Sequence, residues 1–221
     1  MLSYTFIEGF LEKHLDKNKV VALGTSKTSL KVIKQMALHN IIKDLKLKVV
    51  PTSLEIAHTL NDFDIPLSKP GDHIDLVIEF ASFADSFFNY VKTDTSSLVI
   101  DKIITNMASK VVVFLESGRY ENYYDLKVPF EVSTFCVKNT LNNLSAFGEV
   151  TLRKKGSELA RTVGGNYLID LELNKRISFD DLDYKIRRIP GVFETGLFIG
   201  EADKIYLVNK NKIEKKADRL K

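Results

Sequence analysis

A lysine and an aspartate stand close together in the stretch KTDTSSLVID, which runs from Lys92 to Asp101. A protonated amine and a carboxylate at such spacing could share proton transfer and charge stabilisation in a catalytic site. The same stretch has the signature of a helix start, because Ser97 directly precedes the apolar-periodic segment LVIDKI. From these residues alone, the stretch is either an acid–base pair or an ordinary loop that caps a helix.

A second candidate site is the stretch LGTSKTS, which follows an apolar run and opens a helical pattern. Backbone N–H groups and the helix dipole at such a helix N-terminus favour an anion. The hydroxyls of Thr25, Ser26 and Thr28 would suit a phosphate group, and Lys27 would add a cation. The stretch is not a Walker loop, because the Gly-x-x-x-x-Gly-Lys spacing is missing. A helix cap with polar surface side chains explains the same residues equally well.

A carboxylate at the end of a buried strand is the third candidate. Glu79 closes the apolar run in DLVIEFASFAD. The carboxyl ends of parallel strands face the crevice where ligands bind in such folds. An acid in this position is, taken alone, more often a capping or surface residue than a catalyst.

Metal and thiol chemistry find little support in the sequence. The four histidines are isolated and none stands at zinc-like spacing from another ligand: His14, His39, His58 and His73. Neither a Gly-x-Ser-x-Gly elbow nor a dinucleotide Gly-x-Gly-x-x-Gly motif occurs. The single cysteine, Cys136, excludes an intrachain disulfide, and its strand-like surroundings FEVSTFCVK favour a structural thiol over a nucleophile.

The elements that must position these residues alternate between apolar runs and amphipathic patterns. Strands are predicted at 19–23, 47–50, 74–80 and 110–115, and helices at 28–44, 53–63 and 97–108. Ser53 and Ser97 provide helix-start chemistry at two of the junctions. Apolar strands alternating with amphipathic helices predict βαβ units and a parallel sheet covered on both faces.

The pattern changes near Val128 and Pro129. Half-alternating strands are predicted in FEVSTF, GEVTLRKK, NYLIDLEL and VFETGLFI, and helices at 137–144 and 178–189, the latter opened by Ser178. This combination indicates a small α+β domain inserted into the main one. The stretch DKIYLVNK is expected to return as another strand of the first sheet, and the charged tail 209–221 to be a solvated, partly frayed end.

Composition limits the classes of partner. The 221 residues include 32 basic and 29 acidic ones, interspersed along the chain, for a net charge of +3. This balance argues against nucleic acid as an obligatory partner and leaves an anionic small molecule open. Charges interrupt the N-terminal stretch MLSYTFIEGFLEKHLDKNK, which predicts an amphipathic helix and neither a signal peptide nor a membrane span. With the lone cysteine, these features predict a cytoplasmic protein without a membrane partner.

The order of these segments resembles the ribose-5-phosphate isomerase type A family over essentially the whole chain. The resemblance is carried by VVALGTSKTS, VVPTS with a downstream IPL, IDLVIEFASFAD, KTDTSSLVIDKI, KVPFEV, GGNYLIDLEL and, most specifically, IPGVFETGLFIGEAD. It implies an α/β fold, with a Rossmann-like parallel-sheet domain formed by residues 1–128 and 199–221. It also implies a smaller inserted α+β domain of the ferredoxin-like kind at 129–198. The family is usually a homodimer or homotetramer, and the resemblance implies no metal and no cofactor.

The resemblance further implies a mechanism. In the family, a glutamate moves a proton between C1 and C2 of a phosphosugar through an enediolate, while a lysine and two aspartates handle the oxygen charge and the ring-opening proton. On this chain the base falls on Asp101 and the lysine on Lys92. One of the two aspartates falls on Glu79, and the other is replaced by the hydroxyl of Ser82.

Substrate-binding positions are implied in the same way. The phosphate loop Gly-Thr-Gly-Ser-Thr falls on the LGTSKTS stretch, and the Lys-Gly-Gly-Gly-Gly-Ala loop falls on 92–97. A further lysine after the fourth strand falls on Gly118, with Arg119 beside it as a stand-in. The implied substrate-binding residues are Thr25, Ser26, Lys27, Thr28, Phe80, Ala81, Thr93, Asp94, Thr95, Gly118 and Arg119.

The departures from the family pattern are concentrated at this site. An aspartate in place of the base glutamate withdraws the carboxylate by roughly 1 Å or more, and misplacement on that scale can lower the rate about a hundredfold. Non-glycine residues in left-handed backbone conformations are penalised by roughly 1–2 kcal/mol each, so residues 93–96 are expected to follow a different loop path. Asp94 would weaken binding of a phosphosugar unless it faces away, whereas Lys27 adds a favourable charge.

Three hypotheses follow. The first is isomerisation of ribose 5-phosphate and ribulose 5-phosphate, with Asp101 as base, Lys92 as oxyanion partner, and Glu79 with Ser82 in the hydroxyl-proton role. The second is a sugar-phosphate-binding or regulatory paralogue with weak or absent catalysis. The third is an isomerase of another phosphosugar, with a pocket reshaped by Phe80 and Phe83. The first leads because both members of the Lys92–Asp101 pair are retained in type.

Overall fold

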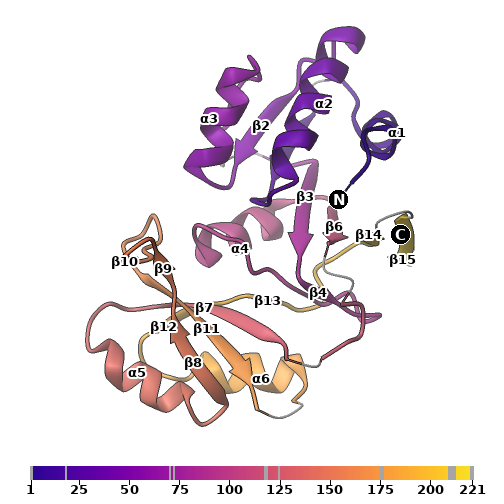
Figure 1. The fold of residues 1–221 in the computed structure, drawn as a ribbon. Coiled ribbons are helices and arrows are strands. Elements are labelled where there is room, and N and C mark those ends of the chain that lie inside the picture. The colour runs from indigo at the N-terminus through magenta and orange to yellow at the C-terminus, as the bar shows by residue number, and fades with distance from the viewer. Residues whose placement is uncertain are drawn as a thin grey trace.

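A six-stranded sheet forms the centre of the larger part of the molecule (Figure 1). The computed structural model describes residues 2–17, 19–69, 71, 73–116, 119–123, 125–174, 177–208 and 213–219. In spatial order the strands are β15 (Ile213–Asp218), β14 (Lys204–Val208), β6 (Val111–Leu115), β3 (Leu76–Ala81), β1 (Val20–Leu23) and β2 (Lys48–Pro51). Neighbouring strands from β14 to β2 are parallel, and β15 pairs with β14 in antiparallel fashion. The predicted parallel sheet is confirmed, and so is the predicted return of the chain to it, over the strand Lys204–Val208; residues 209 and 210 lie outside the described residues.

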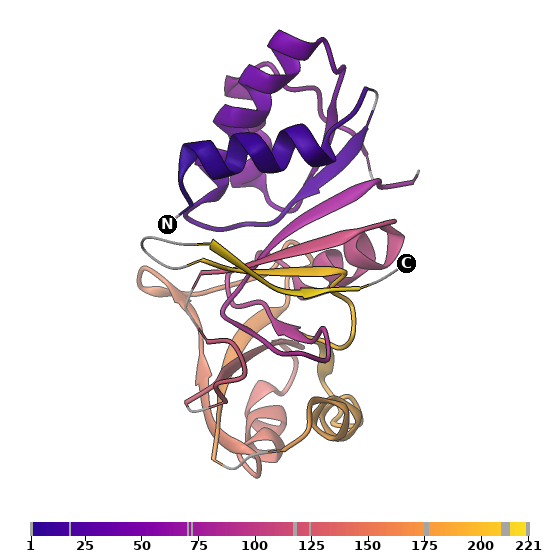
Figure 2. The same cartoon turned by 90° about the vertical axis from the view of Figure 1, so that its right-hand side faces the viewer.

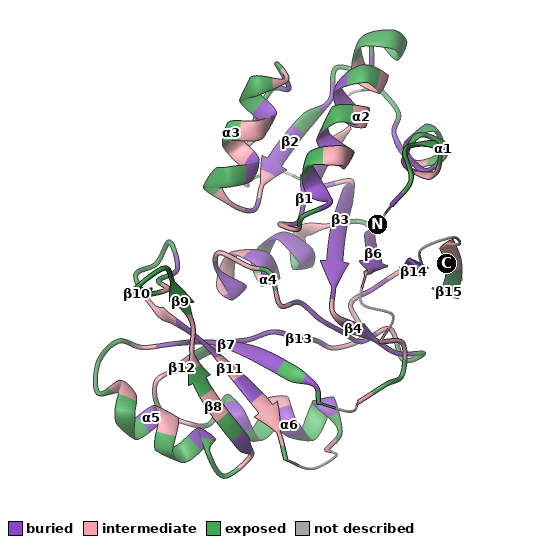
Figure 3. Ribbon diagram, in the orientation of Figure 1, coloured by how far each residue is buried: buried purple, intermediate pink, exposed green. Residues whose placement is uncertain are grey.

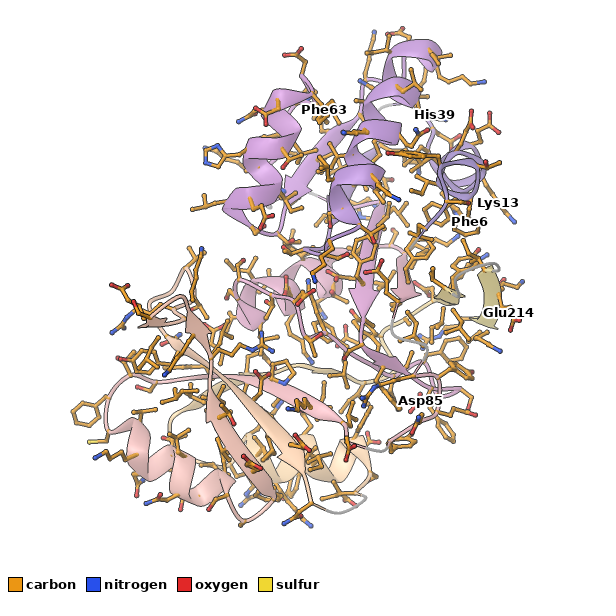
Figure 4. All side chains as sticks on the ribbon, viewed as in Figure 1. Phe6, Lys13, His39, Phe63, Asp85 and Glu214 are labelled. Carbon is orange, nitrogen blue, oxygen red and sulfur yellow. The ribbon has the colours of Figure 1, made fainter. Side chains whose placement is uncertain are left out.

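Helices cover both faces of this sheet. Their bounds are α1 (Tyr4–His14), α2 (Ser29–Lys43), α3 (Leu54–Asp62) and α4 (Leu98–Met107). One core cluster joins α1, α2 and α3 to one sheet face, and a second joins α4 to the other. On the first face, the ring of Phe6, which is labelled in Figure 4, belongs to α1. It packs edge-on against the rings of Phe114 and Tyr206. Because both faces are covered, the central strands β1, β3 and β6 are almost entirely buried (Figure 3).

The helices begin close to the positions that the sequence predicts. The side chains of three serines accept a hydrogen bond from the backbone N–H three residues further along, as N-caps do: Ser53, Ser97 and Ser178. The predicted amphipathic N-terminal helix is present as α1. Among the described residues, no helix is both long and apolar enough to cross a membrane.

The smaller part of the molecule is a four-stranded antiparallel sheet with two helices. Its elements are β7 (Lys127–Val132), α5 (Val137–Leu144), β8 (Gly148–Leu152), β11 (Tyr167–Leu173), α6 (Phe179–Ile186) and β12 (Val192–Thr195). The strand order β12-β7-β11-β8, with this βαββαβ succession, is the ferredoxin-like arrangement implied by the sequence. A two-stranded hairpin, β9 (Lys154–Lys155) and β10 (Glu158–Leu159), projects from it toward the larger part (Figure 1). We propose the domain division at 129–198 against 1–128 and 199–221.

A short three-stranded sheet joins the two parts. It contains β4 (Phe83–Ala84), β5 (Tyr90–Val91) and β13 (Leu197–Phe198), with β5 in the middle. The chain enters and leaves the smaller part on either side of this sheet. The three-stranded sheet therefore holds the small four-stranded sheet beside the carboxyl end of β3.

Two predictions were wrong. The charged tail is not frayed over 213–218, because it forms β15, which lies along β14 at the edge of the sheet (Figure 2). Its apolar Ile213 and Ala217 pair with Val208 and Ile205 of β14, while lysines interleave between them. Residues 209–212, 220 and 221 of the tail lie outside the described residues. Cys136 is not in a strand, because β7 ends four residues earlier; it is exposed, with φ of 50°, directly before α5.

The chain reverses its direction of winding across the sheet between β1 and β3. From β1 it passes to β2 on one side and then crosses back to β3 on the other side. Such a switch point opens a crevice beyond the carboxyl ends of the two strands. Gly24 follows β1 there, and Glu79 belongs to the last residues of β3.

Candidate active site

Three charged side chains meet at this switch point in the interior of the protein. The Nζ atom of Lys92 lies 2.9 Å from Oε1 of Glu79 and 2.9 Å from Oδ1 of Asp101. The side chains of Lys92 and Glu79 are 0% exposed, and that of Asp101 is 1% exposed. Glu79 comes from β3, Lys92 follows β5, and Asp101 lies in the first turn of α4. Three segments that are distant in sequence thus form one buried charge cluster.

The start of α4 holds Asp101 in the cluster. Ser97 is its N-cap in extended backbone conformation, and its side chain accepts from the N–H of Ile100. The hydroxyl of Thr95 donates to Oδ2 of Asp101 at 2.5 Å and accepts from the N–H of Ser97 at 3.0 Å. The positive end of the helix dipole also favours a carboxylate in this first turn. The stretch KTDTSSLVID therefore contains a helix cap and also both members of a charge pair, Lys92 and Asp101.

The loop between Lys92 and α4 follows a path that non-glycine residues can adopt. None of the residues 93–97 has a positive φ, so no left-handed position replaces the family's glycines. The hydroxyl of Ser96 donates to the carbonyl of Thr52 at 2.8 Å, which ties the loop to the end of β2. Asp94 is exposed and Thr93 is half-buried. The charge of Asp94 therefore lies at the surface, away from the buried cluster.

Gly24 provides the space in which Glu79 sits. A Cβ atom at Gly24 would lie 2.4 Å from Oε2 and 2.8 Å from Cδ of Glu79, well inside van der Waals contact. The backbone N–H of Gly24 donates to the carbonyl of Ile78 at 2.8 Å, which continues the pairing of β1 with β3. The glycine of the LGTSKTS stretch is thus required here by close approach and not by its backbone conformation.

Burial and charge act on the cluster in opposite directions. Burial raises the pKa of Glu79 to about 7; the nearby Asp101 adds to this rise, and Lys92 opposes it. Burial works against the charge of Lys92, but Asp101 and Glu79 outweigh it and raise its pKa above the ordinary value. At neutral pH the lysine is therefore an ammonium, and Glu79 is close to the midpoint of its titration. A carboxyl group in that state can both accept and return a proton.

A cleft of about 860 Å³ lies between the two parts of the molecule, next to this cluster. From the larger part it is lined by Thr25, the start of α3 at 53–55, and Thr95 with Ser96. From the smaller part it is lined by the β9–β10 hairpin and by residues up to Leu168 of β11. Thr95 lines the cleft and donates to Asp101, so this member of the charge cluster is separated from the cleft by one side chain.

Thr25 of the loop at 25–28 lines the cleft, but the hydroxyls of this loop already have partners. Ser26 donates to Oε2 of Glu116 at 2.9 Å, and the hydroxyl of Thr28 donates to Oε1 of the same carboxylate. Thr25 donates to the hydroxyl of Ser53 at 3.1 Å, and Lys27 is exposed. Sequence reasoning missed Glu116, although the signal that singled out Glu79 applies to it, since Glu116 directly follows parallel strand β6.

Several other predicted site residues are not brought to the cluster. The side chain of Phe80 lies on the opposite sheet face from Glu79, because neighbouring strand residues alternate, and it packs against Phe114. Ala81 is buried in the apolar cluster under α4. The hydroxyl of Ser82 donates to the carbonyl of Val91 at 3.2 Å.

The end of β6 carries the last of the predicted binding positions. The guanidinium of Arg119 donates to the carbonyl of Asp125 at 3.0 Å. Gly118 lies outside the described residues. Within the described ranges, no three His, Cys, Asp or Glu side chains are grouped so that they could hold a metal ion.

The sequence matches a known family over most of its length. The family model described as ribose 5-phosphate isomerase A, or phosphoriboisomerase A, matches residues 48–212. The ribose-5-phosphate isomerase A of Thermoplasma volcanium is 30% identical over 192 residues, which cover 85% of this chain and 80% of that protein. The protein of the same name from Staphylococcus haemolyticus is 28% identical over 197 residues and 86% of each chain.

Solved structures share the fold. The ribose 5-phosphate isomerase of Plasmodium falciparum superposes with a TM-score of 0.89 over 98% of both chains, at 19% identity. A D-ribose-5-phosphate isomerase in complex with phospho-erythronic acid gives 0.87 over 97% of both chains, at 24% identity. The predicted Rossmann-like fold with a ferredoxin-like insertion is thereby confirmed. Since the family model spans most of the sequence and a relative is 30% identical over 85% of it, the chain belongs to the ribose-5-phosphate isomerase A family.

Proposed function

We propose that the protein interconverts ribose 5-phosphate and ribulose 5-phosphate by proton transfer through an enediolate. The observation that carries the proposal is the buried cluster of one ammonium and two carboxylates beside a cleft. Family membership supports the reaction and the substrate. The related structure that holds phospho-erythronic acid supports a phosphorylated polyhydroxy acid as a ligand of this site.

The three side chains have separate roles in the proposed reaction. The carboxylate of Asp101 takes the proton from C2, and the electron pair of that bond forms the C1=C2 double bond while O1 becomes negative. The ammonium of Lys92 stabilises this charge. The carboxylate of Glu79 takes the proton from the hydroxyl on C2 and passes it to O1. Asp101 then returns its proton to C1, which gives the ketose and restores all three groups.

The phosphate group is proposed to bind at the loop 25–28, of which Thr25 lines the cleft. This loop, which leads into α2, offers backbone N–H groups and hydroxyls, and Lys27 adds a nearby cation. Glu116 shares the same hydroxyls, so phosphate binding requires that Ser26 or Thr28 exchange the carboxylate for the ligand. A phosphate group must therefore compete with the carboxylate of Glu116 for these hydroxyls.

The reaction can be tested with protein purified from a host that lacks its own isomerase. Incubation with ribose 5-phosphate is expected to yield ribulose 5-phosphate, and the Asp101→Asn variant is expected to lose at least about a hundredfold in kcat. The control is Asp62→Asn, which changes an exposed aspartate of α3 and should leave turnover unchanged.

Each outcome of this test decides between functions. Equal turnover by the wild type and the Asp101→Asn variant would contradict the assignment of Asp101 as the base. Thermal stabilisation by ribose 5-phosphate or phospho-erythronic acid without any turnover would instead support a sugar-phosphate-binding protein. The absence of both effects would contradict this substrate altogether.

We also propose that the protein acts in the cytoplasm, in the pentose phosphate pathway, as a homodimer or homotetramer. Exposed apolar side chains on α2, namely Leu38, Ile41 and Ile42, support contact with another copy. Light scattering during size-exclusion chromatography measures the assembly directly, and a monomer at micromolar concentration would contradict it.

A further inference from the structure

The segment between Lys92 and α4 is held at both ends by side chains of the smaller domain. This segment contains no glycine, and it links two members of the charge cluster. In Figure 1, α4 lies between the large sheet and the small one, next to β7. The inference below rests on the proposed isomerase function of that cluster.

Arg153 reaches the first end of the segment. Its Nε and Nη2 atoms donate to the two carboxylate oxygens of Asp170 at 2.7 and 2.5 Å, and its Nη1 atom donates to the carbonyl of Thr93 at 2.6 Å. Arg153 lies between β8 and β9, and Asp170 belongs to β11, so this pair is part of the small domain. A planar guanidinium that donates two hydrogen bonds to one carboxylate has little rotational freedom. Its remaining N–H donor can therefore fix the position of a third group. That group is the carbonyl of Thr93, the residue directly after Lys92.

Glu131 reaches the second end. Its carboxylate, 1% exposed, accepts from the hydroxyl of Ser97 at 3.0 Å and from the N–H of Val99 at 3.3 Å. From its own domain it accepts from the hydroxyl of Thr162 and the amide of Asn166, both at 2.9 Å. The N–H groups of a first helical turn have no partner within the helix. A carboxylate at this place accepts hydrogen bonds from them, and its negative charge interacts favourably with the positive end of the helix dipole. Asp101 lies two residues beyond Val99.

We propose that Arg153 and Glu131 are positioning residues, through which the small domain holds the Lys92–Asp101 segment in the shape that catalysis requires. Neither is assigned contact with the substrate. Arg153 fixes the carbonyl of Thr93, the residue after Lys92, and Glu131 fixes the helical turn that carries Asp101. A displacement of about 1 Å in either group is enough to lower the rate about a hundredfold. The two domains are therefore coupled through this segment as well as through the cleft.

The kinetic test compares three substitutions. Arg153→Met removes the guanidinium, and it is expected to lower kcat about tenfold to a hundredfold with a smaller change in KM. Arg153→Lys keeps a cation for Asp170 but lacks the rigid third donor that reaches the carbonyl of Thr93. Its kcat should therefore fall between those of the wild type and Arg153→Met. The control is Arg187→Met, which removes the ion pairs of an arginine with Asp183 and Glu194 inside the small domain. This variant should leave kcat unchanged. Equal kcat in Arg153→Met and in the control would overturn the proposal.

Amide hydrogen exchange tests the same proposal without depending on turnover. In Arg153→Met and in Glu131→Gln, the amides of residues 93–99 should exchange faster, while those of the central strands keep their wild-type rates. Faster exchange throughout the protein, or none in this segment, would contradict a positioning role. If the wild type shows no isomerase activity, the proposed function fails, but the exchange result still decides whether these residues hold the segment.

Discussion

Glu79 is the residue whose chemistry depends most on its surroundings. It lies in a space left by Gly24, receives the ammonium of Lys92, and is shielded completely from solvent. The same burial that raises the pKa of this carboxyl to about 7 makes it suited to accept and return a proton near neutral pH. Its position in sequence, at the end of an apolar run, indicated the crevice, but the glycine opposite it could be found only from the folded chain.

The raised pKa of Glu79 predicts how stability changes with pH. Between about 4.5 and 7 the native state binds a proton that the unfolded state has released, so this group's contribution to stability falls as pH rises through that window. The total fall is about 3 kcal/mol, since each pKa unit corresponds to about 1.4 kcal/mol. Lys92 does not act in this window, because a lysine whose pKa is raised loses its contribution only in the alkaline range.

A Glu79→Gln variant lacks this term. Its free energy of unfolding relative to the wild type should therefore rise by up to about 3 kcal/mol between pH 4.5 and 7. Urea unfolding of both proteins at several pH values measures the difference. A difference that stays constant over this range would contradict the raised pKa.

Gly24 offers a second test at the scale of single residues. In Gly24→Ala the new methyl group would lie 2.4 Å from the Glu79 carboxylate, so the carboxylate must move. We expect a loss of about 1–3 kcal/mol in stability and a fall in turnover. The control is Gly9→Ala on α1, where the added Cβ meets nothing within 4 Å and should raise stability by up to about 1 kcal/mol. Unchanged turnover in Gly24→Ala would contradict the need for close approach.

At the scale of elements, α4 carries the site because of how it begins. Ser97 caps the helix, Thr95 contacts Asp101 just before it, and Glu131 pairs with the first turn. The sequence predicted this start, because a capping serine before an apolar-periodic run is a local signal. The contacts of Glu131 and Arg153 could not be predicted in this way, since they join segments tens of residues apart and no local pattern encodes them.

Matched cap substitutions separate the functional part of this helix start from its local stability. Ser97→Ala and Ser178→Ala each remove an N-cap and should each lower stability by about 1 kcal/mol. Only Ser97→Ala also removes a donor to Glu131 and disturbs the turn that presents Asp101, so only this variant should lose turnover. Thermal unfolding and steady-state kinetics measure the two effects. Equal kinetics in both variants would show that α4 needs no special positioning.

Elsewhere the strength of the sequence signal decided how well each element could be predicted. The buried parallel strands and their helices were predicted to within a few residues, because apolar runs and amphipathic periods are strong local signals. The edge strand β15 was missed, since its alternation of apolar residues is hidden among lysines and its pairing depends on β14. The face on which Phe80 lies could not be predicted for a similar reason, because the face of a strand that a residue occupies follows from the register of the whole sheet.

At the scale of the whole molecule, two domains enclose the cleft and share control of the site. The larger domain provides Glu79, Lys92 and Asp101, while the smaller domain lines the opposite wall and holds the loop between the last two. Both ends of the glycine-free loop 93–97 are fixed by the smaller domain. The proposed base Asp101 can therefore be held in place although its side chain is shorter than that of a glutamate.

The central claim is that Asp101 carries a proton between C2 and C1 of ribose 5-phosphate. The most direct measurement is to incubate the protein with ribose 5-phosphate that is deuterated at C2 and to follow the removal of this deuteron by nuclear magnetic resonance. We predict that the wild type removes the deuteron from C2 and delivers it to C1 of ribulose 5-phosphate, except for the fraction that exchanges with water, and that Asp101→Asn removes it at least about a hundredfold more slowly. Removal at equal rates in the two proteins, or none with the wild type, would contradict the claim.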